Sequence, residues 1–138
     1  PVGEVHPRAA KLIQITEEAL MKGIQQAVIG NRLGMVSNAI QTHAEKHGFS
    51  VVKEFVGHGI GKNMHEDPPI PNYGRQDRGP TLKQGMTLAI EPMLNIGTFK
   101  VVTKPDEWTV VTQDGQYSAH FEHTIAVTEH GPEILTLR

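Results

Sequence analysis

The chain has 138 residues, 38% of them hydrophobic, with 13 basic and 15 acidic side chains, a formal net charge of -2 at pH 7 and no cysteine. This length suits one domain with its own core and is too short for two well-packed ones. The near balance of charge gives no reason to expect a nucleic-acid partner, and no apolar run reaches the roughly 20 residues that a membrane-spanning helix needs. Because cysteine is absent, a bound metal would need His, Asp or Glu ligands.

The beginning of the chain indicates a fragment of a longer protein. Its first residue is Pro1 rather than Met, and a helical pattern follows almost at once. Nothing at the start resembles a signal peptide, and this, together with the lack of disulfides, makes the cytoplasm the expected compartment.

Apolar residues at helical spacing predict two helices in the first third of the chain. The first covers residues 8–28, with Pro7 where a first helical turn tolerates proline. A break at Gly30 separates it from the second helix, which covers residues 34–47 and is ended by Gly48.

After the second helix, the sequence pattern predicts mostly strands. Residues 67–80 are the exception, because they are rich in proline and glycine and therefore predict an ordered loop. Asp114 and Gly115 mark a turn between two strands. Helices followed by hairpin-linked strands indicate an α+β fold, in which two helices cover one face of a curved, mostly antiparallel sheet. The predicted strands cover residues 50–56, 87–90, 108–112, 119–128 and 134–137.

The run GHGIG, residues 57–61, has two competing interpretations. A phosphate-binding loop would end in Lys62 and needs a helix directly after it to point backbone N–H groups at the anion. Prolines from Pro68 onwards follow too soon for such a helix. We therefore favour a tight turn, in which the glycines let the chain pass close to another segment and present His58. Taken alone, His58 would more often be a buried structural histidine.

Two glutamates strengthen the case for a metal site. Glu91 is the one carboxylate in the apolar run LAIEPM, and Glu122 lies on a predicted strand. Strand alternation places both away from their apolar neighbours, so that exposure to solvent is the ordinary explanation of each. The apolar surroundings of Glu91 instead favour an inward carboxylate that needs a cation. With His58, the two glutamates form a partial ligand set for a divalent ion.

Three further histidines have less specific positions. His65 lies seven residues after His58 in a proline-rich segment, where it could hydrogen-bond a substrate or be a surface histidine. His43 and His47 are spaced i, i+4 on the second helix, as in zinc proteases, but Ala44 stands where that pattern requires glutamate. For this pair we favour a helix surface near a C-terminal end, where histidines suit the helix dipole.

Four segments occur in order along the chain: GHGIGKNMHEDPPIPNYG, LKQGMTLAIEPM, WTVVTQDG and FEHTIAVTEHGPEIL. Together they resemble the C-terminal half of type I, bacterial-type methionine aminopeptidases, which are pita-bread metallohydrolases, and the resemblance extends over essentially the whole chain. It implies that residues 1–138 form the C-terminal half of a pita-bread catalytic domain whose N-terminal half is absent from this chain. Proline-specific peptidases and creatinase share the GHG segment and both glutamates, but IEPM and FEHT favour the methionine enzymes.

The resemblance also implies roles for individual residues. His58 would be a ligand of one metal, Glu91 a metal ligand that assists proton transfer, and Glu122 the carboxylate that bridges both metals. His65 would contact the scissile peptide, so that His65 and Glu91 are the expected catalytic residues.

The implied reaction is the removal of N-terminal methionine from peptides and nascent proteins. Met64 and Trp108 would contact the methionine side chain of the substrate, although phenylalanine is common in the family at the first of these positions. The resemblance further implies two divalent metal ions per complete site, drawn from Co, Mn, Fe and Zn, and attack by a hydroxide that bridges them.

The chain departs from the family in two ways. His120 stands where the family usually has glutamine. The family's two ligand aspartates belong to the N-terminal half, and none of this chain's aspartates lies in a matching context: Asp67, Asp77, Asp106 and Asp114. We therefore expect the N-terminal half of the same enzyme as a partner that completes the site. The alternative is a non-enzymatic pita-bread module that binds proteins or peptides. We expect no nucleic acid and no membrane as partner.

Overall fold

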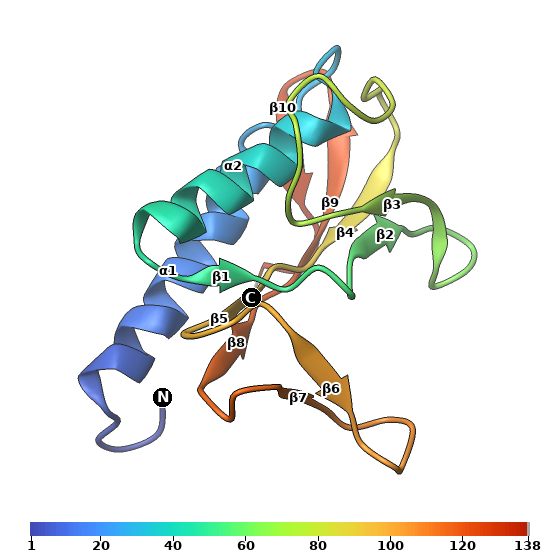
Figure 1. Cartoon of the computed structure of the whole chain (residues 1–138). Helices are drawn as coiled ribbons and strands as arrows, with labels where there is room; N and C mark the ends of the chain where they lie inside the picture. Colours follow the sequence, from blue (N-terminus) through green and yellow to red (C-terminus); the bar gives the residue numbers. More distant parts are fainter. Residues whose placement is uncertain (138) are drawn as a thin grey trace.

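A computed structural model describes residues 1–137, and it begins with the two predicted helices (Figure 1). α1 covers Pro7–Ile24 and α2 covers Leu33–Lys46, so that α1 ends earlier than its sequence pattern suggested. The two helices pack closely at Gly23 of α1, where a Cβ atom would lie 2.7 Å from the Ile40 side chain of α2. Within the described residues, no helix combines the length and hydropathy needed to cross a membrane.

Within residues 1–137, ten short strands form three antiparallel sheets. The largest has the order β10-β9-β4-β2-β3, the second has the order β1-β5-β8, and β6 and β7 form a separate two-stranded ribbon. The strands are β1 Ser50–Val51, β2 Gly57–Gly59, β3 Glu66–Ile70, β4 Thr87–Ile90, β5 Met93–Asn95, β6 Val101–Thr103, β7 Val110–Thr112, β8 Ser118–His120, β9 His123–Thr128 and β10 Gly131–Ile134.

The helices cover one side of the sheets, and the β6–β7 ribbon extends away from this body (Figure 1). α1 contacts β4, β5 and β8, and α2 contacts β1. Fully buried apolar side chains fill the space between the layers, among them Leu12, Ile15 and Leu20 from α1, and Leu88, Ile90 and Leu94 from the sheets. The α+β prediction, with two helices on an antiparallel sheet, is therefore confirmed.

Several predicted strand boundaries were wrong. Residues 119–128 are not one strand but two, because β8 and β9 belong to different sheets and the chain changes sheet between them. The last strand is Gly131–Ile134 rather than 134–137, since a tight turn after β9 lets β10 pair with it immediately. The strand predicted over 50–56 ends at Val51, and the chain bends at residues 53 and 54.

The GHGIG run does not form the predicted turn. Gly57, His58 and Gly59 are strand β2, which lies between β3 and β4. A Cβ at Gly57 would collide with the carbonyl oxygen of Ala89 on β4, so the expected close approach to another segment is present. Part of the predicted loop is regular and forms β3. Within the described residues β3 is an edge strand that pairs only with β2, and prolines are tolerated in edge strands. Bends at residues 61–65 follow β2, which excludes a phosphate-binding helix there.

Candidate functional site

Glu91 lies at the centre of the candidate site, between the end of β4 and the start of β5. Asn72 holds the backbone of Glu91 in place. The fully buried side chain of Asn72 donates a hydrogen bond from Nδ2 to the carbonyl oxygen of Glu91 at 3.1 Å. The Glu91 side chain is only 17% exposed. The inward position agrees with what the apolar surroundings of Glu91 in LAIEPM indicated, and not with the solvent exposure that strand alternation suggested.

The imidazole of His58 faces Glu91 from the neighbouring strand, because His58 on β2 pairs with Ala89 on β4. Nδ1 of His58 lies 2.9 Å from the carbonyl oxygen of Gly59, which can only accept, so Nδ1 carries a hydrogen and donates it. In the neutral ring this leaves the lone pair on Nε2, which lies 3.5 Å from Oε1 of Glu91. A lone pair that faces a carboxylate is the arrangement expected of a metal-ligating histidine with a backbone partner on its other nitrogen.

The second oxygen of Glu91 faces a different pair of residues. Nε2 of His120 lies 3.9 Å from Oε2 of Glu91 and 3.9 Å from Oε2 of Glu122. Glu91, His120 and Glu122 each offer one ligand atom within 4.8 Å of the others. Glu122 does not lie on a strand as predicted, because it occupies the junction between β8 and β9. That junction brings it back toward Glu91.

The electrostatics of the site favour a cation. Burial raises the pKa of Glu91, the negative charge of Glu122 raises it further, and the nearby His120 and His58 offset these effects in part. Two carboxylates therefore lie close together without full compensation in the protein. The donor set of imidazole nitrogen and carboxylate oxygen is one that divalent metal ions accept, so these residues fit a metal ion.

His65 lies directly beside His58. Their ring centroids are 4.3 Å apart with a tilt of 55°, and both rings line a hollow at the β2–β3 junction together with Asn63 and Asp67. Met64 is next to His65 in sequence but 71% exposed, and it is not among the residues that line either this hollow or the larger one described below. The structure thus brings His65 to the site and does not bring Met64 there.

A larger hollow of about 1090 Å³ lies on the other side of Glu91. Glu91 and His120 line it at one end, and Trp108, which is 87% exposed, lines it from the β6–β7 connection. Asp106 holds that connection in shape, since its Oδ1 accepts hydrogen bonds from the backbone N–H groups of Trp108 and Thr109 at 3.1 and 2.8 Å. The predicted substrate residue Trp108 and the predicted ligand Glu91 therefore border one apolar-walled space. Its other walls include Val52, Phe55, Met93, Val110 and Val111.

Two of the aspartates, Asp77 and Asp114, have structural partners outside the site. Asp77 forms an ion pair with Arg75 at 2.9 Å, and Asp114 accepts hydrogen bonds from the backbone of Thr98 and Gln116. These bonds lower the pKa of both carboxyl groups. Within the described residues the cluster consists of Glu91, His120 and Glu122, without an aspartate.

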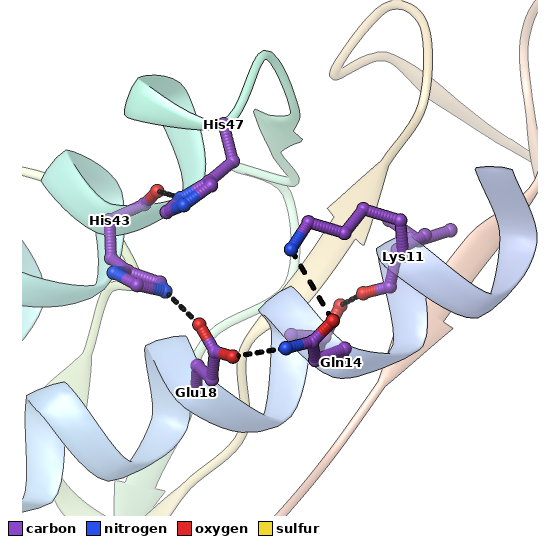
Figure 2. Close-up of polar contacts among 7 residues, drawn as sticks. Lys11, Gln14, Glu18, His43 and His47 are labelled. Atoms are coloured by element: carbon purple, nitrogen blue, oxygen red, sulfur yellow. Dashed lines mark hydrogen bonds and ion pairs between the residues drawn. The ribbon is translucent and has the colours of Figure 1, made fainter. Parts of the chain in front are cut away.

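His43 and His47 lie near the C-terminal end of α2, and each makes a hydrogen bond away from the Glu91 cluster (Figure 2). Nε2 of His43 donates to Oε2 of Glu18 on α1 at 2.9 Å, and Nδ1 of His47 donates to the carbonyl oxygen of His43 at 2.8 Å. Glu18 also accepts a hydrogen bond from Gln14 at 2.7 Å, and Gln14 accepts one from Lys11 at 3.3 Å (Figure 2). This polar network bridges the two helices and lies apart from the Glu91 cluster.

Two positioning residues were missed from the sequence, Asn72 and Asp106. Both are polar residues in turn-rich segments, where an exposed side chain is the default expectation. In the sequence Asn72 directly follows Pro71 and comes before the LAIEPM strand, and this position does not reveal that its side chain is buried. The contact of Asp106 with Trp108 and Thr109 follows the short-range pattern of aspartate turns and could have been found from spacing alone.

The chain matches known metallopeptidases over nearly its whole length. The profile of metallopeptidase family M24 matches residues 1–129. The methionine aminopeptidase of Clostridium acetobutylicum is 57% identical over 136 residues, which are 99% of this chain and 54% of that protein. Methionine aminopeptidase 1 of Bacillus subtilis is also 57% identical over 136 residues, with 99% and 55% covered. The chain thus spans about half the length of the curated relatives it matches.

Solved structures agree in fold. Methionine aminopeptidase from Thermotoga maritima gives a TM-score of 0.97 at 52% identity, over 99% of this chain and 55% of that chain. Methionine aminopeptidase from Rickettsia prowazekii gives 0.95 at 50% identity, over 98% and 55%. A prolidase from Pyrococcus furiosus gives 0.72 at 22% identity, over 99% and 35%, which shows the shared pita-bread fold alone. By sequence profile, identity and fold, the chain belongs to metallopeptidase family M24.

Proposed function

We propose that residues 1–138 are the C-terminal half of the catalytic domain of a methionine aminopeptidase, which removes N-terminal methionine from peptides and nascent proteins. Relatives that are 57% identical carry this name, and the chain spans about half their length. The observation that carries the proposal is the position of Glu91. One carboxylate oxygen faces His58, the other faces His120, and the same residue borders the hollow that reaches Trp108.

His58, Glu91 and Glu122 are the proposed protein ligands of the metal ions. The family implies divalent metal ions, and the imidazole and carboxylate donors fit borderline ions such as Co, Mn, Fe and Zn. We propose two ions per complete site, and the carboxylate of Glu122 would be the ligand that both share. The remaining ligands would come from the N-terminal half of the same enzyme, which is the proposed partner of this chain. The proposed compartment is the cytoplasm, with no nucleic acid or membrane partner.

Bound divalent ions would acidify a water molecule and polarise the scissile carbonyl. Glu91 would accept a proton at its carboxylate and pass it to the leaving amine, a role that suits an inward carboxylate in a largely apolar wall. His65, held against His58, donates a hydrogen bond to the scissile peptide as negative charge develops, where one donor is worth about 3 kcal/mol. Trp108, which lines the larger hollow, contacts the methionine side chain of the substrate.

The proposal is tested by metal analysis and by a methionyl-peptide cleavage assay. Both are run on this chain alone and on this chain complemented with the upstream half of the Bacillus subtilis relative. We expect metal uptake and cleavage in the complemented protein, and loss of cleavage in Glu122→Ala but not in Glu129→Ala, a matched change at an exposed side chain. A complemented protein that binds no metal, or that keeps its activity in Glu122→Ala, would refute the proposal. Peptide binding without cleavage would instead support the non-enzymatic module.

A further inference from the structure

His120 belongs to the site by position, although the resemblance assigns it no role. The geometry points to His120 as an additional ligand, through Nε2, of the divalent ion held by Glu91 and Glu122. This inference rests on the proposed function, because it concerns the same metal centre.

The backbone fixes His120 opposite the segment that carries Glu91. His120 on β8 pairs with Met93 on β5, two residues after Glu91. The N–H of Phe121 then donates to the carbonyl oxygen of Pro92 at 3.3 Å. These contacts anchor the end of β8 just before Glu122, and directly after Glu122 the residue His123 pairs with Ile90 on β4. The proximity of the three side chains is therefore a consequence of strand register rather than of one side-chain rotamer.

The distances distinguish a metal ligand from a simple hydrogen-bond partner. A histidine that serves only to bond a carboxylate lies about 2.7 to 3.2 Å from it, as His43 does from Glu18 at 2.9 Å. Nε2 of His120 instead lies 3.9 Å from each of two carboxylate oxygens, and within residues 1–137 its ring makes no hydrogen bond. Donor atoms that share one divalent ion lie about 3 to 4 Å apart, given metal–ligand distances of about 2.0 to 2.3 Å. The spacing of His120 fits a shared ion.

The chemistry of this ligand has a consequence for metal choice. Glutamine, which the family usually has at this position, offers an amide oxygen, whereas His120 offers an imidazole nitrogen. Imidazole favours Co, Fe and Zn, while oxygen donors suit Mn. A chain with His120 should therefore discriminate more strongly in favour of Co²⁺ over Mn²⁺ than its His120→Gln variant does.

Cysteine substitution offers a direct test, because the natural chain contains no cysteine. In His120→Cys, loaded with Co²⁺ in the complemented protein described above, a thiolate in contact with the ion would give a sulfur-to-cobalt charge-transfer band in the near ultraviolet. His130→Cys is the matched control, because the His130 side chain is exposed and its ring lies beside Glu129, outside the cluster of Glu91, His120 and Glu122. We expect the band in His120→Cys alone.

Co²⁺ and Mn²⁺ titrations of His120→Gln supply the second measurement. We expect Co²⁺ affinity to fall about 10- to 100-fold, Mn²⁺ affinity to fall less, and His130→Gln to bind as the natural chain does. If the natural protein takes up Co²⁺ but His120→Cys shows no band and His120→Gln binds normally, His120 is not a ligand and the proposed function stands. If the natural protein takes up no Co²⁺ at all, the metal centre fails, and both proposals fail with it.

Discussion

Two histidine–glutamate pairs in this chain show how the same residue types can serve structure or chemistry. His43 and Glu18 join α1 to α2 through a hydrogen bond of 2.9 Å, while His58 and Glu91 face each other at 3.5 Å between β2 and the end of β4. The pKa of Glu18 is lowered, chiefly by the hydrogen bond from His43, whereas the pKa of Glu91 is raised by burial and by Glu122. The carboxylate of Glu18 has hydrogen-bond partners within the protein that stabilise its charge. The carboxylate of Glu91 does not have enough positive charge around it to offset its burial and the charge of Glu122.

The contrast teaches that a histidine near a glutamate is not by itself a site. What distinguishes the pair at Glu91 is a lone pair pointed at a carboxylate, since Nδ1 of His58 already donates to the backbone. Variants can therefore break one pair and leave the other intact. Those that disturb the backbone at β2 should have the largest effects, and those at the helix pair the smallest.

Gly57→Ala should be the most damaging change. The new Cβ would collide with the backbone carbonyl of Ala89 and force β2 away from β4, which also moves His58 from Glu91. We expect a loss of about 3 kcal/mol in the free energy of unfolding, measured by urea denaturation. Gly61→Ala is the control, because there the added Cβ meets only the flexible end of the Glu66 side chain. Equal stability of the two variants would contradict the close-approach explanation of β2.

Glu91→Gln should have the next largest effect, on metal binding. If Glu91 is a ligand as proposed, its replacement should weaken Co²⁺ binding by the complemented protein about 100-fold or more, whereas Glu18→Gln should leave that binding unchanged. In the metal-free chain the same substitution should have a favourable effect, in this case on thermal stability. Because the raised pKa means that the folded state disfavours the charged form of Glu91, Glu91→Gln should increase the melting temperature measured in EDTA. A lower melting temperature would show that Glu91 is already stabilised by the protein alone.

The sequence could predict the residues of the site better than their surroundings. Glu91 was found because a single carboxylate in an apolar run must either face solvent or, if it faces inward, have a cation as partner. The structure shows that it faces inward. The two helices were found because their apolar spacing extends over many residues. Both are local patterns that one segment carries by itself.

Other features of the fold and of the site could not be predicted, because they depend on contacts between segments that are far apart in the sequence. The run GHGIG looks like a turn because glycine permits one, yet Gly57 is needed for its small size between two strands. The split between β8 and β9 cannot be read from residues 119–128, because it is set by pairing with β5 on one side and β4 on the other. The proximity of His120 to Glu91 follows from that same split.

Asn72→Ala should have an intermediate effect that acts through Glu91. It removes the donor to the backbone of Glu91 and leaves a void at a fully buried position, with an expected cost of about 1 to 3 kcal/mol. Co²⁺ affinity should fall about tenfold, because the ligand loses its support. Asn38→Ala is the matched control, since Asn38 makes the equivalent bond to the carbonyl oxygen of Gly74 at the helix side of the same loop. If both variants lowered Co²⁺ affinity equally, Asn72 would stabilise the loop and not position Glu91.

Glu18→Gln should have the smallest effect, visible mainly as a change with pH. Because hydrogen bonds from His43 and then Gln14 lower the pKa of Glu18 in the folded chain, its contribution to stability is complete above the ordinary glutamate pKa of about 4.3 and is lost as the pH falls through the lower folded value. The difference in melting temperature between the natural chain and Glu18→Gln should therefore shrink as the pH is lowered from about 6 to about 3. Glu17→Gln, at an exposed position on the same helix, should give a difference that stays flat. If the difference in melting temperature between the natural chain and Glu18→Gln did not shrink at low pH, His43 and Glu18 would contribute no measurable electrostatic stabilisation. The two helices would then be held together by packing at Gly23 and Ile40.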